Sequence, residues 1–447
     1  MKPNSDWLRF GSGMVHVKKG DIQKAEEIFN DIHAGNPSFG HAPARLGFIR
    51  HDEGNIEAAK LFFNRALDNL PDDEMGHYYR GLIHMKTGEY DEAENSFSIV
   101  ITLNPLRFDA IINYAGVIGR KGDFRKAENI VAEAYRKDET HRNGFAWLGW
   151  IKTEEHDWAG ALAIMNRDYQ ESRVDPWWVV NIALMFGRVG DWDKAVKLMK
   201  DAYASANNLK DGFARLGWIK AESQDWTSAI DIMKRDINED RITPNWRINY
   251  SIMLVFAGDN TGAERLVHDL YSINKNAKNG YAKIGWAHYL LYRDKQSLNS
   301  LIRKDAVLNR MSDVGKRLNA IALCIDGKLD EAVTLANALY SESPLEKDVF
   351  AIMGWELIKN GDLEIGMEFM EKDYIANRLS TVWRTNYAYR LAKYGQCKKA
   401  KKIFQEVMKN EPYRQELRIG YQIIPSVVMS LQEFKEMVGL EILKYEN

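Results

Sequence analysis

The chain has 447 residues, a formal net charge of −2 and 28% charged residues. Such balanced charge argues against a nucleic-acid binder, because those proteins gain affinity by neutralising phosphates. No apolar run reaches the roughly 18 residues of a membrane span, and residues 1–10 lack the apolar segment of a secretory signal. With only Cys324 and Cys397, a disulfide framework is excluded, and we expect a cytoplasmic protein.

A 34-residue period runs along the chain from its N-terminal end. A glycine followed by an acidic or amide residue recurs at this step, with an alanine and a phenylalanine at fixed distances behind it. The first members are Gly20, Gly54, Gly88 and Gly122, with Ala25, Ala59, Ala93 and Ala127, and with Phe29, Phe63 and Phe97. The period slips by one residue in the turn before Asp294 and then resumes, so twelve units fill residues 6–414.

Each unit is predicted to form two helices joined by a tight turn. The first helix carries a small residue near its middle, where a bulky side chain would keep the second helix away. Because glycine disfavours a helix interior by about 1 kcal/mol, close packing is the expected reason for its presence. These positions are Gly13, Gly47, Gly81, Ala115, Gly149, Ala183, Gly217, Gly285, Gly354 and Ala388.

The second helix of each unit is expected to begin at an N-cap residue. The turn glycine supplies a left-handed residue after the first helix, and the residue behind it caps the second helix. The predicted N-caps are Asp21, Asn55, Asp123, Asp157, Asp191, Asp225, Asp259, Asp294 and Asp362.

Residues 415–447, after the last unit, are predicted to form a helical cap. Ser430 and Glu433 fit a capping box at the start of a helix. The apolar stripe of this helix consists of Leu431, Phe434, Val438 and Ile442. A stack whose units contact only their neighbours needs such a protected end.

This pattern resembles the tetratricopeptide repeat family over nearly the whole chain. The family's leucine–glycine, alanine-x₃-phenylalanine and terminal proline elements correspond to Leu46-Gly47, Ala59, Phe63 and Pro71. The resemblance implies an all-α, right-handed superhelical solenoid of about twelve helix pairs with a C-terminal capping helix and a concave groove lined by the first helices. The expected parts are units 1–4 in residues 1–141, units 5–12 as four double units in residues 142–414, and the cap in residues 415–447.

A second period of 68 residues begins with the fifth unit. In alternate units a tryptophan follows the first-helix glycine, at Trp150, Trp218, Trp286 and Trp355. The second helix of these units ends with an aspartate, and the next unit carries a Trp-x-x-Asn pattern or a close variant. The aspartates are Asp168, Asp236, Asp305 and Asp373, and the asparagines are Asn181, Asn249 and Asn386.

These aspartates stand where the family usually keeps a small alanine. A carboxylate late in a helix opposes the helix dipole, so we expect each one to have a hydrogen-bond donor. The structural interpretation is a bracing bond to the asparagine, an indole N–H or the backbone of the next unit. The functional alternative is a ring of carboxylates that grips a ligand, and we favour bracing.

The tryptophans also allow two interpretations. By the family's geometry their position faces the groove, where an aromatic row could anchor an amphipathic helix or an extended peptide, or stack on sugar rings. The alternative is that each ring fills space between adjacent first helices. The predicted partner-binding groove comprises Trp150, Trp218, Trp286, Trp355, Phe48, Tyr78, Leu184 and Tyr389.

Motifs for catalysis, metals and cofactors are missing from the sequence. The ten histidines form no HExxH motif or Cys/His cluster, and no GxGxxG or GxxxxGK[ST] loop occurs. Cys324 and Cys397 lack a CxxC partner and are expected to be small buried apolar groups. The lysine, asparagine and arginine clamp of the family's co-chaperone members is also absent from the matching positions. We therefore expect no enzyme activity, no metal and no cofactor.

The sequence predicts a non-catalytic scaffold or adaptor that binds a protein or peptide segment in an apolar groove. Polar residues at the groove edge would set the partner's register, namely Asn143, Asp211, Asn279 and Asp348. The double units also suit a homo-oligomer. Two alternatives stay open: a carbohydrate-associated protein of polysaccharide assembly or export, whose tryptophans stack on glycans, and a peptide-sensing regulatory module. Nucleic acid and a membrane span are not expected.

Overall fold

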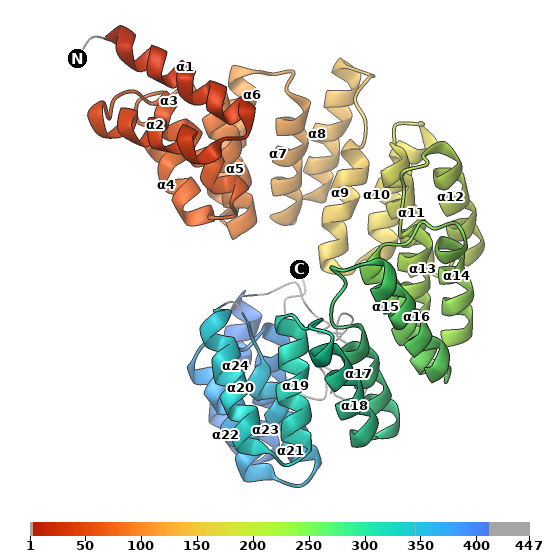
Figure 1. Cartoon of the computed structure of the whole chain (residues 1–447). Helices are drawn as coiled ribbons and strands as arrows, with labels where there is room; N and C mark the ends of the chain where they lie inside the picture. Colours follow the sequence, from red (N-terminus) through yellow and green to blue (C-terminus); the bar gives the residue numbers. More distant parts are fainter. Residues whose placement is uncertain (1–2, 345, 411–447) are drawn as a thin grey trace. The chain divides into compact units, whose positions relative to one another are not determined.

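Twelve consecutive pairs of α-helices make up the part of the chain that the computed structural model describes, residues 3–344 and 346–410 (Figure 1). These residues contain no strand, and one 3₁₀ turn, Thr153–Glu155, follows the helix Gly144–Lys152. The chain divides into two bodies, residues 1–185 and 186–447, with the boundary inside the helix Pro176–Arg188. The prediction of an all-α chain of about twelve helix pairs is confirmed.

The two helices of each pair follow one another directly along the chain. The first six pairs are α1 (Pro3–Lys19) and α2 (Ile22–Gly35), α3 (His41–Asp52) and α4 (Ile56–Leu67), α5 (Glu74–Thr87) and α6 (Tyr90–Leu103), α7 (Phe108–Arg120) and α8 (Phe124–Lys137), α9 (Gly144–Lys152) and α10 (Trp158–Gln170), and α11 (Pro176–Arg188) and α12 (Trp192–Ser205). The other six are α13 (Gly212–Ala221) and α14 (Trp226–Asn238), α15 (Pro244–Phe256) and α16 (Asn260–Ile273), α17 (Gly280–Tyr292) and α18 (Lys295–Val307), α19 (Asp313–Ile325) and α20 (Leu329–Glu342), α21 (Val349–Lys359) and α22 (Leu363–Ile375), and α23 (Thr381–Lys393) and α24 (Cys397–Asn410).

The mid-helix glycines let the two helices of a pair approach closely. A Cβ atom at Gly81 of α5 would lie 2.8 Å from the ring of Phe97 on α6. A Cβ atom at Gly217 of α13 would lie 2.6 Å from the carbonyl oxygen of Ala229 on α14. Neither distance leaves room for a methyl group in a close-packed interior, which confirms the packing role predicted for these glycines.

Turn chemistry determines where the second helices begin. Gly190 has φ 89°, a conformation that side chains disfavour, and Asp191 behind it accepts a hydrogen bond from the backbone N–H of Lys194 at 3.2 Å. Eight of the nine predicted N-caps accept such a bond. Asp362 takes the N-cap position of α22 without a side-chain bond.

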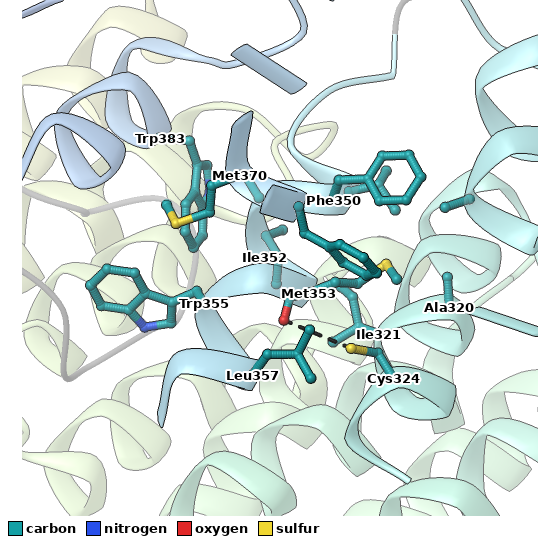
Figure 2. Close-up of a cluster of buried hydrophobic side chains, with 14 of the residues drawn as sticks. Ala320, Ile321, Cys324, Phe350, Ile352, Met353, Trp355, Leu357, Met370 and Trp383 are labelled. Atoms are coloured by element: carbon teal, nitrogen blue, oxygen red, sulfur yellow. Dashed lines mark hydrogen bonds between the residues drawn. The ribbon is translucent and has the colours of Figure 1, made fainter. Parts of the chain in front are cut away.

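Successive pairs stack through apolar side chains within each body. In residues 186–447, one cluster runs from α17 to α24 and includes the buried residues Tyr289, Leu339, Phe369 and Tyr387; Figure 2 shows the part around Met353. Consecutive first helices of this body, such as α15, α17, α19 and α21, also contact one another. These four first helices therefore form a connected layer, which carries the predicted binding residues Trp286 and Trp355.

The predicted C-terminal cap lies outside the described residues. This applies to residues 415–447 as a whole, with the capping box of Ser430 and Glu433 and the stripe of Leu431, Phe434, Val438 and Ile442.

Candidate partner-binding surface

The four aspartates of the 68-residue period lie near the C-terminal ends of α10, α14, α18 and α22. Their side chains are fully buried. In each case one oxygen accepts a hydrogen bond from a tyrosine hydroxyl of the preceding pair, and the other accepts from a backbone N–H at the start of the pair's own first helix. For Asp236 the donors are Tyr203 Oη at 2.6 Å and the N–H of Ala214 at 2.7 Å. We call this arrangement the Tyr–Asp clasp.

The clasp recurs four times with nearly the same geometry. In each copy the tyrosine hydroxyl also accepts a hydrogen bond from the residue that opens the first helix, as Tyr203 does from the N–H of Gly212 at 2.7 Å. The four clasps consist of Tyr135, Asp168, Gly144 and Ala146; Tyr203, Asp236, Gly212 and Ala214; Tyr271, Asp305, Gly280 and Ala282; and Tyr340, Asp373, Val349 and Ala351. Two N–H groups that no intrahelical bond can satisfy thereby find acceptors.

A left-handed residue and an arginine complete each clasp. Asp211, with φ 63°, donates its N–H to the carbonyl of Arg241 at 2.8 Å and accepts from the N–H of Thr243 at 2.6 Å. The guanidinium of Arg241 lies 4.7 Å from the ring centroid of Tyr203. The same left-handed conformation and equivalent bonds occur at Asn143, Asn279 and Asp348. These polar residues, predicted to set a partner's register, bond instead with the chain's own loops.

Burial raises the pKa of the clasp carboxyl groups. For Asp168, Asp236 and Asp373 the pKa rises to about 6, because desolvation outweighs the hydrogen bonds that favour the charged form. The pKa of Asp305 is raised for the same reason. Since these side chains have no exposed surface, their oxygens do not face a ligand.

The predicted bonds from these aspartates to the following unit are absent from the structure. The donors precede each aspartate in the chain, and the asparagines are not its partners, although Asn181 and Asn386 are buried and Asn249 is half-buried. The two helices of a pair run in opposite directions, so the end of the second helix lies beside the start of the first. Unpaired N–H groups are concentrated there, which explains the direction of the bonds.

The tyrosines and arginines of the clasps were not predicted from the sequence. The tyrosines are Tyr135, Tyr203, Tyr271 and Tyr340, and the arginines are Arg173, Arg241, Arg310 and Arg378. Both sets repeat at the spacing that revealed the tryptophans and aspartates. The same comparison between double units would have found them.

The predicted tryptophan row loses exposure along the chain. Trp150 is 39% exposed, whereas Trp355 is 3% exposed. The ring of Trp355 meets that of Trp383 edge-on at 5.9 Å (Figure 2), and the guanidinium of Arg390 lies 4.0 Å from its centroid. Trp355 therefore fills the core and offers almost no surface to a partner.

The two tryptophans between these extremes are half-buried. Trp218 meets Trp246 of the next first helix edge-on, with ring centroids 6.1 Å apart. Trp286 stacks on Tyr289 of its own helix at 5.5 Å. Each ring keeps one side in contact with protein and one part accessible.

The other predicted groove residues differ in the same way. Phe48 is half-buried and meets Phe63 edge-on at 5.1 Å. Tyr78 is half-buried beneath the guanidinium of Arg107, 4.1 Å from its ring centroid. Tyr389 is half-buried, and Leu184 is buried. Leu184, like Trp355, therefore adds no accessible area to the candidate surface.

Within residues 3–344 and 346–410, no group of three His, Cys, Asp or Glu side chains is placed to hold a metal ion. None of the helices described there combines the length and the apolar character needed to cross a membrane.

Residues 50–107, which include all of α4, α5 and α6, match the tetratricopeptide repeat family. Turns like theirs, with a glycine of positive φ, recur at Gly20, Gly122, Gly190, Gly258, Gly327, Gly361 and Gly395. Residues 50–107 therefore contain tetratricopeptide repeats. A tetratricopeptide repeat fold is in general a protein-interaction scaffold.

Several proteins are similar to this chain. Tetratricopeptide repeat protein 37 of Xenopus laevis is 22% identical over 246 residues, which are 53% of this chain and 16% of that protein. Superkiller complex protein 3 of Mus musculus is 25% identical over 175 residues, 38% of this chain and 11% of that protein. The chain thus spans less than a fifth of the length of either. A TPR repeat-containing protein of Methanocaldococcus jannaschii is 21% identical over 395 residues, 74% of this chain and 68% of that protein.

Two solved structures are similar to it as well. A tetratricopeptide repeat protein from Parabacteroides merdae has a TM-score of 0.43 at 16% identity and covers 53% of this chain and 93% of its own. Yeast Tom70 has a TM-score of 0.36 at 13% identity and covers 83% of this chain and 85% of its own.

Proposed function

We propose that the chain is a non-catalytic scaffold that binds a protein segment along its first helices. The observation that supports this best is the partial exposure of one equivalent tryptophan in three of the four double units, Trp150, Trp218 and Trp286. Tryptophan offers a large contact area and is enriched among the residues that dominate binding energy at interfaces.

The burial of the repeated aspartates supports the same proposal. All four carboxyl groups are enclosed in Tyr–Asp clasps and have no exposed surface. Of the repeated aspartates and tryptophans, the side chains that reach solvent are therefore Trp150, Trp218 and Trp286. An aromatic surface of this kind suits an amphipathic helix or an extended apolar segment.

Site-specific photo-crosslinking tests this proposal in cells that express the chain. Trp150 and Trp218 are replaced, in separate variants, by a benzophenone derivative of phenylalanine. Control variants carry the same group at Asp201 of α12 and Lys234 of α14, two exposed positions on second helices. Circular dichroism first checks that all four variants keep their helix content.

A protein adduct formed from positions 150 or 218, and not from positions 201 or 234, is the expected result. Adducts of equal yield at all four positions, or at none of them, would contradict a binding surface on the first helices. A glycan adduct from the first-helix positions would favour the carbohydrate-associated alternative.

A further inference from the structure

Helix α1 (red in Figure 1) has apolar side chains on two opposite sides. One side packs against α2, where a Cβ atom at Gly13 would lie 2.5 Å from the ring of Phe29. The other side carries Leu8, Ser12 and Val15, spaced by four and three residues. Leu8 is 76% exposed, Val15 is 51% exposed, and Ser12 is exposed as well. Within the part of the chain that the structure describes, no helix covers this second side.

The equivalent side of the next first helix is covered. The residues 34 positions later in the chain are Ala42, Leu46 and Ile49 of α3, and all three are buried in one cluster with Phe29 and Ile32 of α2. Helices α5, α7 and α9 likewise contact the second helix that precedes each of them. In the following pairs, a helix therefore packs on the face that α1 presents to solvent.

The exposed face of α1 has a shape of its own. Alanine or glycine stands at the position of Leu8 in the next four pairs, namely Ala42, Gly76, Ala110 and Gly144. The preceding second helix passes close to this position: a Cβ atom at Gly144 would lie 2.8 Å from the side chain of Val131 on α8. In α1 the small residues are instead Gly11 and Ser12, and no atom lies within 4 Å of the Cβ position of Gly11. A second helix packed as in those pairs would overlap Leu8.

A face with small residues in its middle and large ones at both ends suits a helix that crosses it. Two packed helices are closest at the crossing point and diverge on either side of it, so large side chains fit beyond that point. Leu8 lies three residues before Gly11, and Val15 lies three residues after Ser12. None of the four residues carries a charge. The face therefore matches a second copy of itself that is turned about a two-fold axis.

We propose that this α1 face, formed by Leu8, Gly11, Ser12 and Val15, binds the α1 face of a second copy of this chain in a two-fold symmetric dimer. Because the face belongs to one helix, the contact is small, and the dimer forms and separates as the concentration changes. The inference goes beyond the proposed scaffold function and uses other residues. A dimer of scaffolds would present two partner-binding surfaces and so bind a partner with repeated segments more tightly.

Sedimentation velocity of the full chain over a wide range of concentrations tests the inference. We expect a monomer at low concentration and a dimer at high concentration. Leu8→Glu should weaken the dimer by roughly tenfold or more, because each half of the symmetric contact would then bury a charge. Leu61→Glu is the matched control and should leave the dimer unchanged, since Leu61 is a 50% exposed leucine on α4. Circular dichroism first checks the helix content of both variants.

Disulfide trapping locates the contact. The starting chain carries Cys397→Ser, because Cys397 is exposed. Ser12→Cys should link two chains rapidly under mild oxidation, because the two copies of this residue lie at the crossing point. Lys18→Cys, at an exposed position of the same helix, should link slowly, since crossing helices have diverged there. This measurement keeps the inference testable if Leu8→Glu does not fold.

A wild type that stays monomeric at every concentration would overturn the inference and leave the face to another partner. Equal effects of Leu8→Glu and Leu61→Glu, or equally fast linking through positions 12 and 18, would overturn it too. These results leave the scaffold proposal standing, because that proposal depends on adducts from Trp150 and Trp218. Absence of those adducts from a chain that still forms the dimer would count against the scaffold proposal alone.

Discussion

The hydroxyl of Tyr203 on α12 donates a hydrogen bond over 2.6 Å to Oδ1 of Asp236 on α14, two helices further along the chain. The same hydroxyl accepts the N–H of Gly212, and Oδ2 of Asp236 accepts the N–H of Ala214. Buried polar groups thereby satisfy one another and hold the start of α13 against α12 and α14. The clasp therefore contributes to stability at an identifiable place, which mutations can probe.

Replacing Tyr203 with phenylalanine should destabilise the chain by about 1–3 kcal/mol, because it leaves a buried N–H and a buried carboxyl oxygen without a partner. Hydrogen exchange should accelerate at the amides of Gly212 and Ala214, and not at those of Gly280 and Ala282 in the next clasp. Mass spectrometry of exchanged peptides measures both. The control Tyr292→Phe, at a half-exposed position, should change stability by less than about 0.5 kcal/mol.

Asp236 should give folding a pH dependence of its own. Its pKa of about 6 lies above the ordinary value of 3.8 because the side chain is buried, so the fold favours the protonated carboxyl. The stabilisation is therefore complete below about pH 4 and declines as the pH rises through 6. At about 1.4 kcal/mol for each pKa unit, the decline amounts to roughly 2–3 kcal/mol.

Asp236→Asn removes this titration. In urea unfolding experiments, the stability advantage of the wild type over the variant should shrink by that amount between pH 4 and pH 7. A constant difference over this range would mean that the carboxyl keeps an ordinary pKa in the folded chain.

The pairing of helices was predictable because it depends on local signals. A turn glycine, an N-cap aspartate and a glycine opposite an aromatic ring each act within one unit. Gly190 takes the left-handed turn conformation, Asp191 caps the second helix, and Gly81 lies against a phenylalanine ring, as the sequence predicts. Burial of Asp236 was not predictable in the same way, since its partner Tyr203 lies in the preceding pair. The exposure of each tryptophan depends on which side chain of the next first helix packs against it. For Trp355 on α21 this side chain is Trp383 on α23.

Gly217→Ala should destabilise the chain by about 1–3 kcal/mol, because the added methyl group would overlap the backbone oxygen of Ala229, which cannot move aside alone. Gly11→Ala is the matched control. Gly11 also lies inside a first helix, but no atom lies within 4 Å of its Cβ position. Alanine should therefore stabilise α1 there by up to about 1 kcal/mol. Equal effects of the two substitutions in thermal unfolding would refute the packing explanation.

The tryptophans at equivalent positions should respond differently to truncation. Trp355→Ala should cost about 3–5 kcal/mol, because it opens a cavity in the core between α21 and α23. Trp150→Ala should cost much less, because the ring is 39% exposed. Chemical unfolding of the two variants compares them directly. A larger loss of unfolding free energy for Trp150→Ala than for Trp355→Ala would contradict this explanation from burial.

The two cysteines should react at very different rates. Cys324 is buried and its pKa rises to about 12, chiefly through desolvation, whereas Cys397 is exposed, so the expectation that both are buried is wrong for Cys397. A disulfide reagent such as Ellman's should titrate one thiol in the folded chain and two in denaturant. Cys397→Ser should abolish the reaction of the folded chain, and a persistent signal from this variant would show that Cys324 is accessible.

The placement of the clasps constrains how such a chain can change in length. The last three clasps each take their tyrosine from the pair that ends one double unit and their aspartate from the pair that begins the next, as Tyr203 on α12 and Asp236 on α14 do. Deletion of a single helix pair would leave a buried aspartate without the tyrosine hydroxyl that donates a hydrogen bond to it. Excision of a whole double unit would instead bring Tyr203 into register with Asp305. The fold should therefore tolerate duplication or deletion of two helix pairs together better than of one pair. The double unit is then the segment by which this part of the chain can lengthen or shorten during evolution.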